Sequence, residues 1–370
     1  MNSIIYIGMD VHTTNYTLCA YCFAEDKEYY ITKVQPDYKN ILKYIDRLRQ
    51  EFGEDTKFVC GYEAGCLGYS LYYQLLPYGI ECIIMAPTTI AYSSVNKKIK
   101  TDKRDAALLA KTLATKTYSA VVVPADEDLK IKEYIRMRED QKKIIIIMKQ
   151  KILAFCNRHG IRYTAGGNWT VAHLDWLRKF ELDDIYREIL DEYLATLDYQ
   201  MRKLERLDSR IEEFAKLERY EEKVKNLRCF SGIETYTALA VITEISDFTR
   251  FEKATHFASY LGLVPGEHSS SDKSVRTSIT KAGNTHIRKL LIEAVQGTTR
   301  GSVGIKSKRL VAKQNGNTPM VIHYADKGND RIKRKYKRMI FKGVASNKAK
   351  VAVARELACY IWGMMNDKIY

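Results

Sequence analysis

Four acidic residues in the first third of the chain lie where the local pattern predicts the end of a strand or the start of a helix. Asp10 stands in an apolar run, Glu63 directly follows a buried-strand pattern, and Asp102 and Asp105 lie three apart where a helix begins. That spacing puts two carboxylates on one helical face, roughly 5 to 6 Å apart at Cβ. Four carboxylates that meet at one edge of a sheet would bind one or two Mg²⁺ ions, as nucleases do for phosphoryl transfer.

A purely structural interpretation competes for the two acids of the helix. Asp102 is placed to cap the helix N-terminus, and Asp105 would be a first-turn acid favoured by the helix dipole. Asp10 is harder to explain in this way, because an acid in an apolar run is costly to bury unless it is paired or binds a cation. The residues by themselves leave the structural and the metal-binding interpretations open.

A second constellation lies in the segment 265–288. Three consecutive serines, Ser269 to Ser271, stand among basic side chains, so a hydroxyl nucleophile would lie beside cations that stabilise a phosphate. The alternative is a flexible serine-rich turn that only contacts a phosphate backbone, and the local chemistry favours this alternative. The neighbouring basic residues are His268, Lys273, Arg276, Lys281 and Arg288.

The elements that must position the four acids read as an α/β domain. Apolar and alternating patterns predict strands over 4–11, around 16–20, and over 28–34, 57–62 and 81–85. Amphipathic segments over 41–48 and 67–76 predict helices between the later strands. The order predicts a mixed sheet covered by helices.

The rest of the chain reads as helical. One long helix is predicted over 126–158, with a break near Gly160, and a second helical stretch over 183–225 carries an apolar residue every three to four positions. That narrow stripe is typical of a coiled-coil seam, which would serve either self-association or packing within one chain. We therefore predict three regions: 1–125, 126–225 and 226–370.

Composition and charge restrict the class of protein. The chain has 370 residues, 46% hydrophobic and 28% charged, a globular mixture that excludes wholesale disorder. Its formal net charge of +15 predicts a polyanionic partner, and between residues 300 and 350 the only acids are Asp326 and Asp330. No apolar run reaches the roughly 20 residues of a membrane span. Without a signal-peptide pattern at the start, we expect a cytoplasmic protein.

The motifs, taken in order, resemble those of the DEDD transposases of the insertion-sequence 110/1111 group, which are relatives of the pilin-gene invertases. The resemblance extends from near residue 4 to about Trp362. It rests on Gly8-Met-Asp-Val-His12, Tyr62-Glu-Ala-Gly65, Lys100-Thr-Asp-Lys-Arg-Asp-Ala106, Phe257-Ala-Ser-Tyr-Leu-Gly-Leu-Val-Pro265, the serine cluster and Lys281-Ala-Gly-Asn284.

This resemblance implies a RuvC-like, ribonuclease-H-type N-terminal domain, a coiled-coil middle and a mainly helical C-terminal transposase domain with a catalytic serine. The four acids would be metal ligands, with Mg²⁺ as cofactor. The family's serine motif falls on Ser270. The glycine that follows it in the family is replaced by Ser271, and the next position is Asp272, so Ser269 and Ser271 are rivals for the role.

The implied activity is cleavage and rejoining of double-stranded DNA through a covalent phosphoserine. The metal-bearing domain and the serine would come from different subunits of a homo-oligomer, a dimer or tetramer, guided by a structured RNA. Such a protein would be associated with the nucleoid of a bacterium or archaeon. The residues expected to bind nucleic acid are Lys273, Arg276, Lys281, Arg288, Arg331, Lys333, Arg334 and Lys335.

Three other functions compete with this one. A RuvC-like nuclease would hydrolyse branched DNA junctions with the acids alone. A sugar-kinase or actin-like ATPase would use the segment Gly8 to Asn15 as a phosphate loop, but no adenosine-binding glycine motif follows and +15 is an unusual charge for that class. A non-catalytic relic would bind nucleic acid in a salt-dependent manner without changing it.

Overall fold

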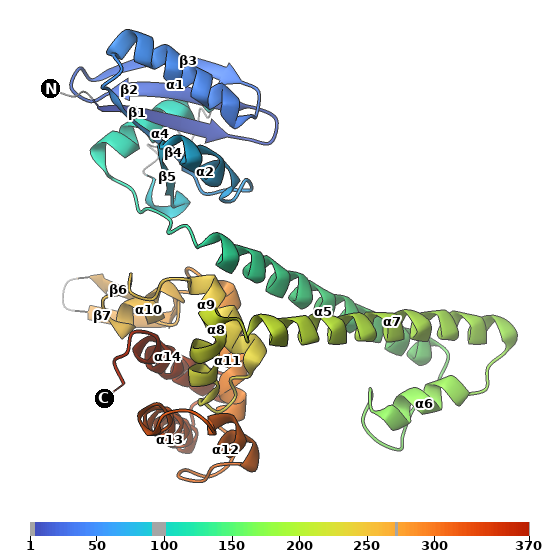
Figure 1. The fold of residues 1–370 in the computed structure, drawn as a ribbon. Helices are drawn as coiled ribbons and strands as arrows, with labels where there is room; N and C mark the ends of the chain where they lie inside the picture. Colours follow the sequence, from blue (N-terminus) through green and yellow to red (C-terminus); the bar gives the residue numbers. More distant parts are fainter. Residues whose placement is uncertain (1–3, 91–100, 271–272, 370) are drawn as a thin grey trace. The chain divides into compact units, whose positions relative to one another are not determined.

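The structure is a computed structural model that describes residues 4–90, 101–270 and 273–369 (Figure 1). The chain forms two compact units, residues 1–123 and 124–370. The second unit contains the long helices as well as the C-terminal region, and its division into 126–225 and 226–370 stays a prediction. Within the described residues, no helix combines the length and apolar character that crossing a membrane requires.

The first unit is built on a five-stranded mixed sheet with the order β3-β2-β1-β4-β5. Strands β1 and β2 and strands β2 and β3 pair antiparallel, while β1 and β4 and then β4 and β5 pair parallel. The mixed α/β character predicted for this region is confirmed. The strands are β1 (Ile4–Val11), β2 (Tyr16–Cys22), β3 (Lys27–Val34), β4 (Lys57–Glu63) and β5 (Glu81–Met85).

Helices cover both faces of this sheet. Residues Ile5, Ile7 and Met9 of β1 share one apolar cluster with α1 (Tyr38–Phe52) and α2 (Ser70–Leu75). Because successive side chains of a strand point to opposite faces, Gly8 and Asp10 face the other way, toward α4 (Asp102–Thr115). Two short 3₁₀ turns, η1 (Leu76–Tyr78) and η2 (Pro87–Thr89), flank β5.

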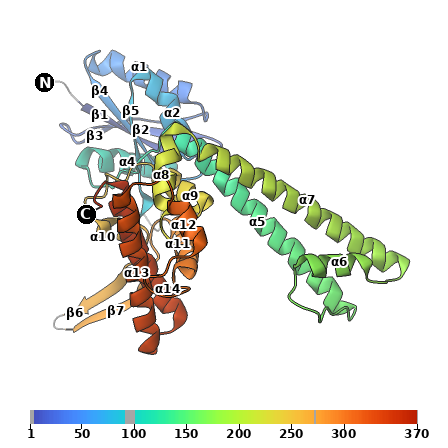
Figure 2. The same cartoon turned by 60° about the horizontal axis from the view of Figure 1, so that its bottom comes forward.

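A helical hairpin opens the second unit. Helix α5 (Asp126–Arg158) has the predicted bounds, and it packs side by side with α7 (Asp184–Phe214), as both views show (Figures 1 and 2). The short helix α6 (Val171–Lys179) lies at the tip, where it joins an apolar and aromatic cluster of α5 and α7.

The sequence prediction for the second long helix is corrected in two respects. The stretch predicted over 183–225 is interrupted between the end of α7 and the start of α8 (Glu218–Arg228). The predicted seam included Ile185 and Ile189, but these side chains are 70% and 37% exposed, whereas Leu190 and Leu194 are buried. The buried stripe therefore departs from the predicted one in the first half of α7, where contacts with α5 and α6 select it, and it coincides with the predicted seam at Leu197 and Ile211.

The C-terminal part is mostly helical and packs around α9 (Thr235–Ile245), whose side chains are buried on nearly all sides. The sequence did not predict the antiparallel hairpin of β6 (Pro265–Ser270) and β7 (Lys273–Ile279). The remaining helices are α10 (Ala254–Tyr260), α11 (Thr285–Thr298), α12 (Lys308–Gln314), α13 (Pro319–Phe341) and α14 (Ser346–Met365).

Candidate metal centre and serine hairpin

Close packing of α4 on the sheet brings the acids together. A Cβ atom at Gly8 would lie 2.1 Å from the carbonyl oxygen of Ala106 and 2.2 Å from the backbone nitrogen of Ala110. A side chain at position 8 would therefore push the helix away from the sheet. Asp10, two residues further along the same face of β1, comes to lie beside the first turn of α4.

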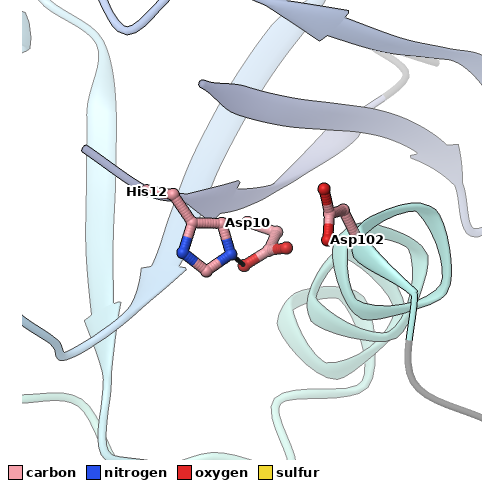
Figure 3. A group of neighbouring side chains, drawn as sticks. All are labelled: Asp10, His12 and Asp102. Carbon is pink, nitrogen blue, oxygen red and sulfur yellow. Dashed lines mark ion pairs between the residues drawn. The ribbon is translucent and has the colours of Figure 1, made fainter. Parts of the chain in front are cut away.

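Asp10, His12 and Asp102 form a cluster of three side chains that could hold a metal ion (Figure 3). Each offers one ligand atom, and these atoms lie within 4.8 Å of one another. His12 Nε2 lies 3.3 Å from Asp10 Oδ1, and the Asp10 side chain is only 17% exposed. Its other oxygen, Oδ2, is buried without a hydrogen-bond partner among the described residues.

The electrostatics of the group favour a bound cation. Burial raises the pKa of Asp10, His12 opposes that shift, and the nearby charges of Asp105 and Asp102 raise the pKa further. A hydrogen bond from Lys33 lowers the pKa of Asp102. An orphaned buried carboxylate oxygen beside a second carboxylate and an imidazole fits a divalent cation, since Mg²⁺ and Mn²⁺ prefer oxygen ligands and Mn²⁺ also accepts imidazole nitrogen.

The other two predicted acids lie at the same edge of the sheet. Asp105 is buried, and its charge acts on Asp10. The parallel register pairs Met9 with Tyr62, so the next residue, Glu63, stands beside Asp10 on the neighbouring strand, at the same face. The group within 4.8 Å includes neither of these acids.

Two details of this site differ from the sequence interpretation. Asp102 does not cap α4: the cap is Thr101, whose side-chain oxygen accepts from the backbone N–H of Arg104 at 3.4 Å. The sequence left His12 without a role, although it lies two residues after Asp10 and directly follows the end of β1, and that spacing was the available signal.

The predicted nucleophile lies at the tip of the C-terminal hairpin. Ser270 ends β6 and pairs with Lys273 in the antiparallel register, and Ser269 pairs with Ser274. Arg276 pairs with Glu267 further along the hairpin. The rival Ser271 and its neighbour Asp272 lie outside the described residues.

The motif Lys281-Ala-Gly-Asn284 anchors this hairpin to the helical core. Gly283 has a φ of +73°, and a Cβ atom there would lie 1.9 Å from the carbonyl oxygen of Tyr260, so only glycine fits. Asn284 caps α11 and donates from Nδ2 to Oε2 of the buried Glu244 at 2.9 Å. The side chain of Lys281 is exposed.

Two residues predicted to bind nucleic acid have structural contacts instead. Arg288 is 9% exposed and donates to the carbonyl oxygens of Leu261 and Ala282. Lys333 is 5% exposed and donates to the carbonyl oxygens of Ser302 and Ile305. Because each cation is buried and already bonded to backbone carbonyls, neither side chain is available to a phosphate in this structure.

The other predicted cations of the tail are accessible. Arg331 and Arg334 are exposed and Lys335 is partly exposed, all three on α13. Arg331 and Lys335 both form ion pairs with Glu356 of α14, at 2.7 and 2.6 Å. These pairs leave the outer face of α13 positively charged.

Comparisons with known proteins show that this chain is similar to transposases. The family model DEDD_Tnp_IS110, described as "Transposase", matches residues 7–159, and the model described as "Transposase IS116/IS110/IS902 family" matches residues 224–309. The transposase for insertion sequence element IS1533 of Leptospira borgpetersenii is 30% identical over 92% of this chain and 97% of its own length.

Two further relatives extend the comparison. The putative transposase y4qE of Sinorhizobium fredii is 31% identical over 91% of this chain and 82% of its own length. The pilin gene-inverting protein of Moraxella bovis is 24% identical over 77% of this chain and 80% of its own length. With both family models matched and two relatives at least 30% identical over more than nine tenths of this chain, this chain belongs to the IS110 family of DEDD transposases.

Proposed function

We propose that this transposase excises and inserts its own element by cleaving and rejoining double-stranded DNA at a composite site. Asp10, Asp102, Asp105 and Glu63 would bind Mg²⁺ in a RuvC-like domain, and Ser270 would be the nucleophile. The observation that supports the metal-binding part of the proposal is that Oδ2 of Asp10, next to Asp102, is buried and has no hydrogen-bond partner in the part of the chain that the structure describes.

The covalent step exchanges one phosphoester bond for another, so it needs no external energy source. The hydroxyl oxygen of Ser270 bonds to a backbone phosphorus, its proton passes to solvent, and the bond from phosphorus to one deoxyribose oxygen breaks. That oxygen takes a proton and leaves as a hydroxyl end. The hydroxyl end of another strand then attacks the phosphoserine and restores the serine. A divalent cation held by Asp10, Glu63, Asp102 and Asp105 would stabilise the charge that develops on the phosphate oxygens.

The remaining parts of the proposal concern partners. A homo-oligomer, a dimer or tetramer joined through a coiled coil of the α5–α7 hairpin, would bring the serine of one subunit to the metal site of another. The net charge of +15 supports binding of DNA and of a structured guide RNA, with Lys273, Arg276, Lys281, Arg331, Arg334 and Lys335 as the expected contacts.

An excision assay tests both halves of the site. A plasmid carries the element with its native flanks, and the rejoined junction is amplified for wild type, Asp10→Ala and Ser270→Ala. We expect both variants to lose excision. Matched controls are Asp55→Ala, an exposed acid of the first unit, and Ser209→Ala, an exposed serine of α7, which should excise normally.

The contrary outcomes point to the competing functions. Excision by Asp10→Ala at the wild-type level would overturn the metal half. Release of free ends from a junction substrate by Ser270→Ala would favour a hydrolytic RuvC-like nuclease. Tight, salt-sensitive binding with unchanged DNA in every assay would favour a non-catalytic relic.

A further inference from the structure

Helix α13 carries a one-sided stripe of cations that ends in an aromatic ring. The stripe consists of Lys327, Arg331, Arg334, Arg338 and Phe341, which follow one another at spacings of four, three, four and three residues. At 3.6 residues per turn these positions fall within an arc of about 80°. All five residues are exposed, and Phe341 is 93% exposed.

The stripe borders a cavity on the surface of the second unit. This cavity of about 510 Å³ lies between α13 and α14 and is lined by basic residues of the stripe together with Lys335, Glu356 and Tyr360. Glu356 partly neutralises Arg331 and Lys335, and Asp330 lies 3.8 Å from Arg334. Among the residues that the structure describes, neither Lys327 nor Arg338 has an ion-pair partner.

The exposure of Phe341 is not explained by a role in stabilising the fold. A buried phenylalanine stabilises a protein by roughly 1.5 to 3 kcal/mol, and this one is at the surface at the last residue of α13. The next residue, Lys342, is also exposed. An exposed ring among positive charges matches the surfaces on which proteins bind nucleic acid, where cations contact phosphates and aromatic rings stack on bases.

We propose that this stripe binds one DNA strand, with the cations on phosphates of that strand and the ring of Phe341 stacked on an unpaired or terminal base. From residue 327 to residue 341 the helix is about 21 Å long. That length matches roughly six phosphates of one strand. The inference rests on the proposed DNA-cleaving function, which creates strand ends and unpaired bases.

Charge argues for DNA against a second copy of this chain. Two copies joined face to face through this stripe would bring like charges together, an arrangement that costs several kcal/mol. A polyanion instead neutralises the stripe and releases its counterions.

The test uses the full-length protein and a DNA duplex with an unpaired 2-aminopurine at one end. Wild type should quench the 2-aminopurine on binding, because stacking on the ring quenches it. Phe341→Ala should lose the quench and bind about five- to 100-fold more weakly, while Phe341→Trp should retain both. The control is Ile340→Ala, an adjacent exposed apolar residue that lies on another side of the helix.

The salt dependence separates the two kinds of contact. The double variant Arg334→Ala/Arg338→Ala should lower the slope of log K against log salt by about two, whereas Phe341→Ala should leave the slope unchanged. Wild-type affinity and quenching in Phe341→Ala would overturn the stacking role while leaving DNA binding intact. No DNA binding by wild type would instead contradict the proposed function.

Two other outcomes would also overturn the assignment. If wild type quenches 2-aminopurine in an RNA probe of the same sequence but not in the DNA probe, and Phe341→Ala loses that quench, the ring stacks on RNA instead of DNA. If wild type shows no quench, and sedimentation velocity shows a wild-type dimer that Phe341→Ala dissociates, the ring of Phe341 serves self-association.

Discussion

Lys33 Nζ lies 2.9 Å from Asp102 Oδ2, so a cation supplied by the protein occupies one carboxylate of the candidate metal centre. Lys33 is on β3, and the cross-strand register aligns it with Thr17 on β2, which in turn aligns with Asp10 on β1. All three side chains therefore lie on the face that α4 covers. A divalent cation that binds Asp102 must compete with this ammonium group.

Replacing Lys33 with methionine should tighten metal binding. The pair is about half exposed, and such pairs contribute roughly 0.2–1 kcal/mol, so Lys33→Met should bind Mn²⁺ up to about fivefold more tightly. Titration of Mn²⁺ followed by electron paramagnetic resonance measures the free ion directly. The control is Lys57→Met, which removes an equally exposed pair with Glu81 in the same sheet. Unchanged affinity in a folded Lys33→Met protein would contradict the competition.

Asp10→Asn should stabilise the metal-free protein and abolish its response to metal. Burial is the main cause of the raised pKa of Asp10. An acid whose folded pKa is raised destabilises the fold once it ionises, so the penalty grows as pH rises above the unfolded value of 3.8. We expect Asp10→Asn to gain about 1 kcal/mol at pH 7 and little at pH 4.

Thermal unfolding at both pH values, with and without Mn²⁺, measures the effects of Asp10→Asn. Mn²⁺ should raise the melting temperature of wild type and of the control Asp55→Asn, an exposed acid. Stabilisation of Asp10→Asn by Mn²⁺ to the wild-type extent would exclude Asp10 as a ligand.

Gly8→Ala should separate α4 from the sheet. The new Cβ would lie 2.1 Å from a backbone oxygen of α4, which cannot rotate away as a side chain would. We expect a loss of about 3 kcal/mol in the free energy of unfolding, together with loss of Mn²⁺ binding. The control is Gly65→Ala, where the nearest atom to a Cβ is 3.8 Å away.

Far-ultraviolet circular dichroism should be used to follow unfolding of the first unit, since all three tryptophans (169, 176 and 362) lie in the second unit and their fluorescence would not report on it. Equal stability of the two variants would contradict this packing argument.

The first unit could be predicted from sequence because its signals are local. Apolar runs in the sequence mark its strands. Because β1 and β4 pair in parallel, the ends of both strands lie at one edge of the sheet. Asp10 and Glu63 lie at that edge, as the sequence predicted. The contact between Lys33 and Asp102 could not be predicted, because it depends on the register of three strands and on a helix 69 residues away.

The second unit was less predictable because its determinants are long-range. The two strands β6 and β7 consist mainly of polar residues, four of them serines, and Val275 and Ile279 are their only large apolar side chains, so no apolar run marks them as strands. Charge composition assigned Arg288 to nucleic acid, although it precedes the buried Leu291 and Val295 by three and seven residues. That spacing marks the buried face of the helix and was the missed signal.

Asp128 should prove important for the stability of the second unit. It is 2% exposed and accepts hydrogen bonds from Arg219, Tyr220 and Ser246, which joins the first turn of α5 to α8 and to the end of α9. Burial opposes its ionisation, but these donors prevail and its pKa is lowered from 3.8. The stabilisation is therefore fully present above about pH 5 and is lost as the pH falls below 3.8 toward the folded pKa.

Asp128→Asn should accordingly cost about 2 to 4 kcal/mol at pH 7, because it leaves Arg219 without its carboxylate and buries a mismatched donor. The difference from wild type should shrink as the pH falls below 3.8, the ordinary value for the carboxyl. Denaturant unfolding followed by tryptophan fluorescence reports on this unit. The control is Asp126→Asn two residues earlier, whose half-exposed pair with Lys130 should contribute less than about 1 kcal/mol. A difference that stays constant from pH 7 to pH 3 would contradict the role of the ionised carboxylate, because only the charged form receives all three donors.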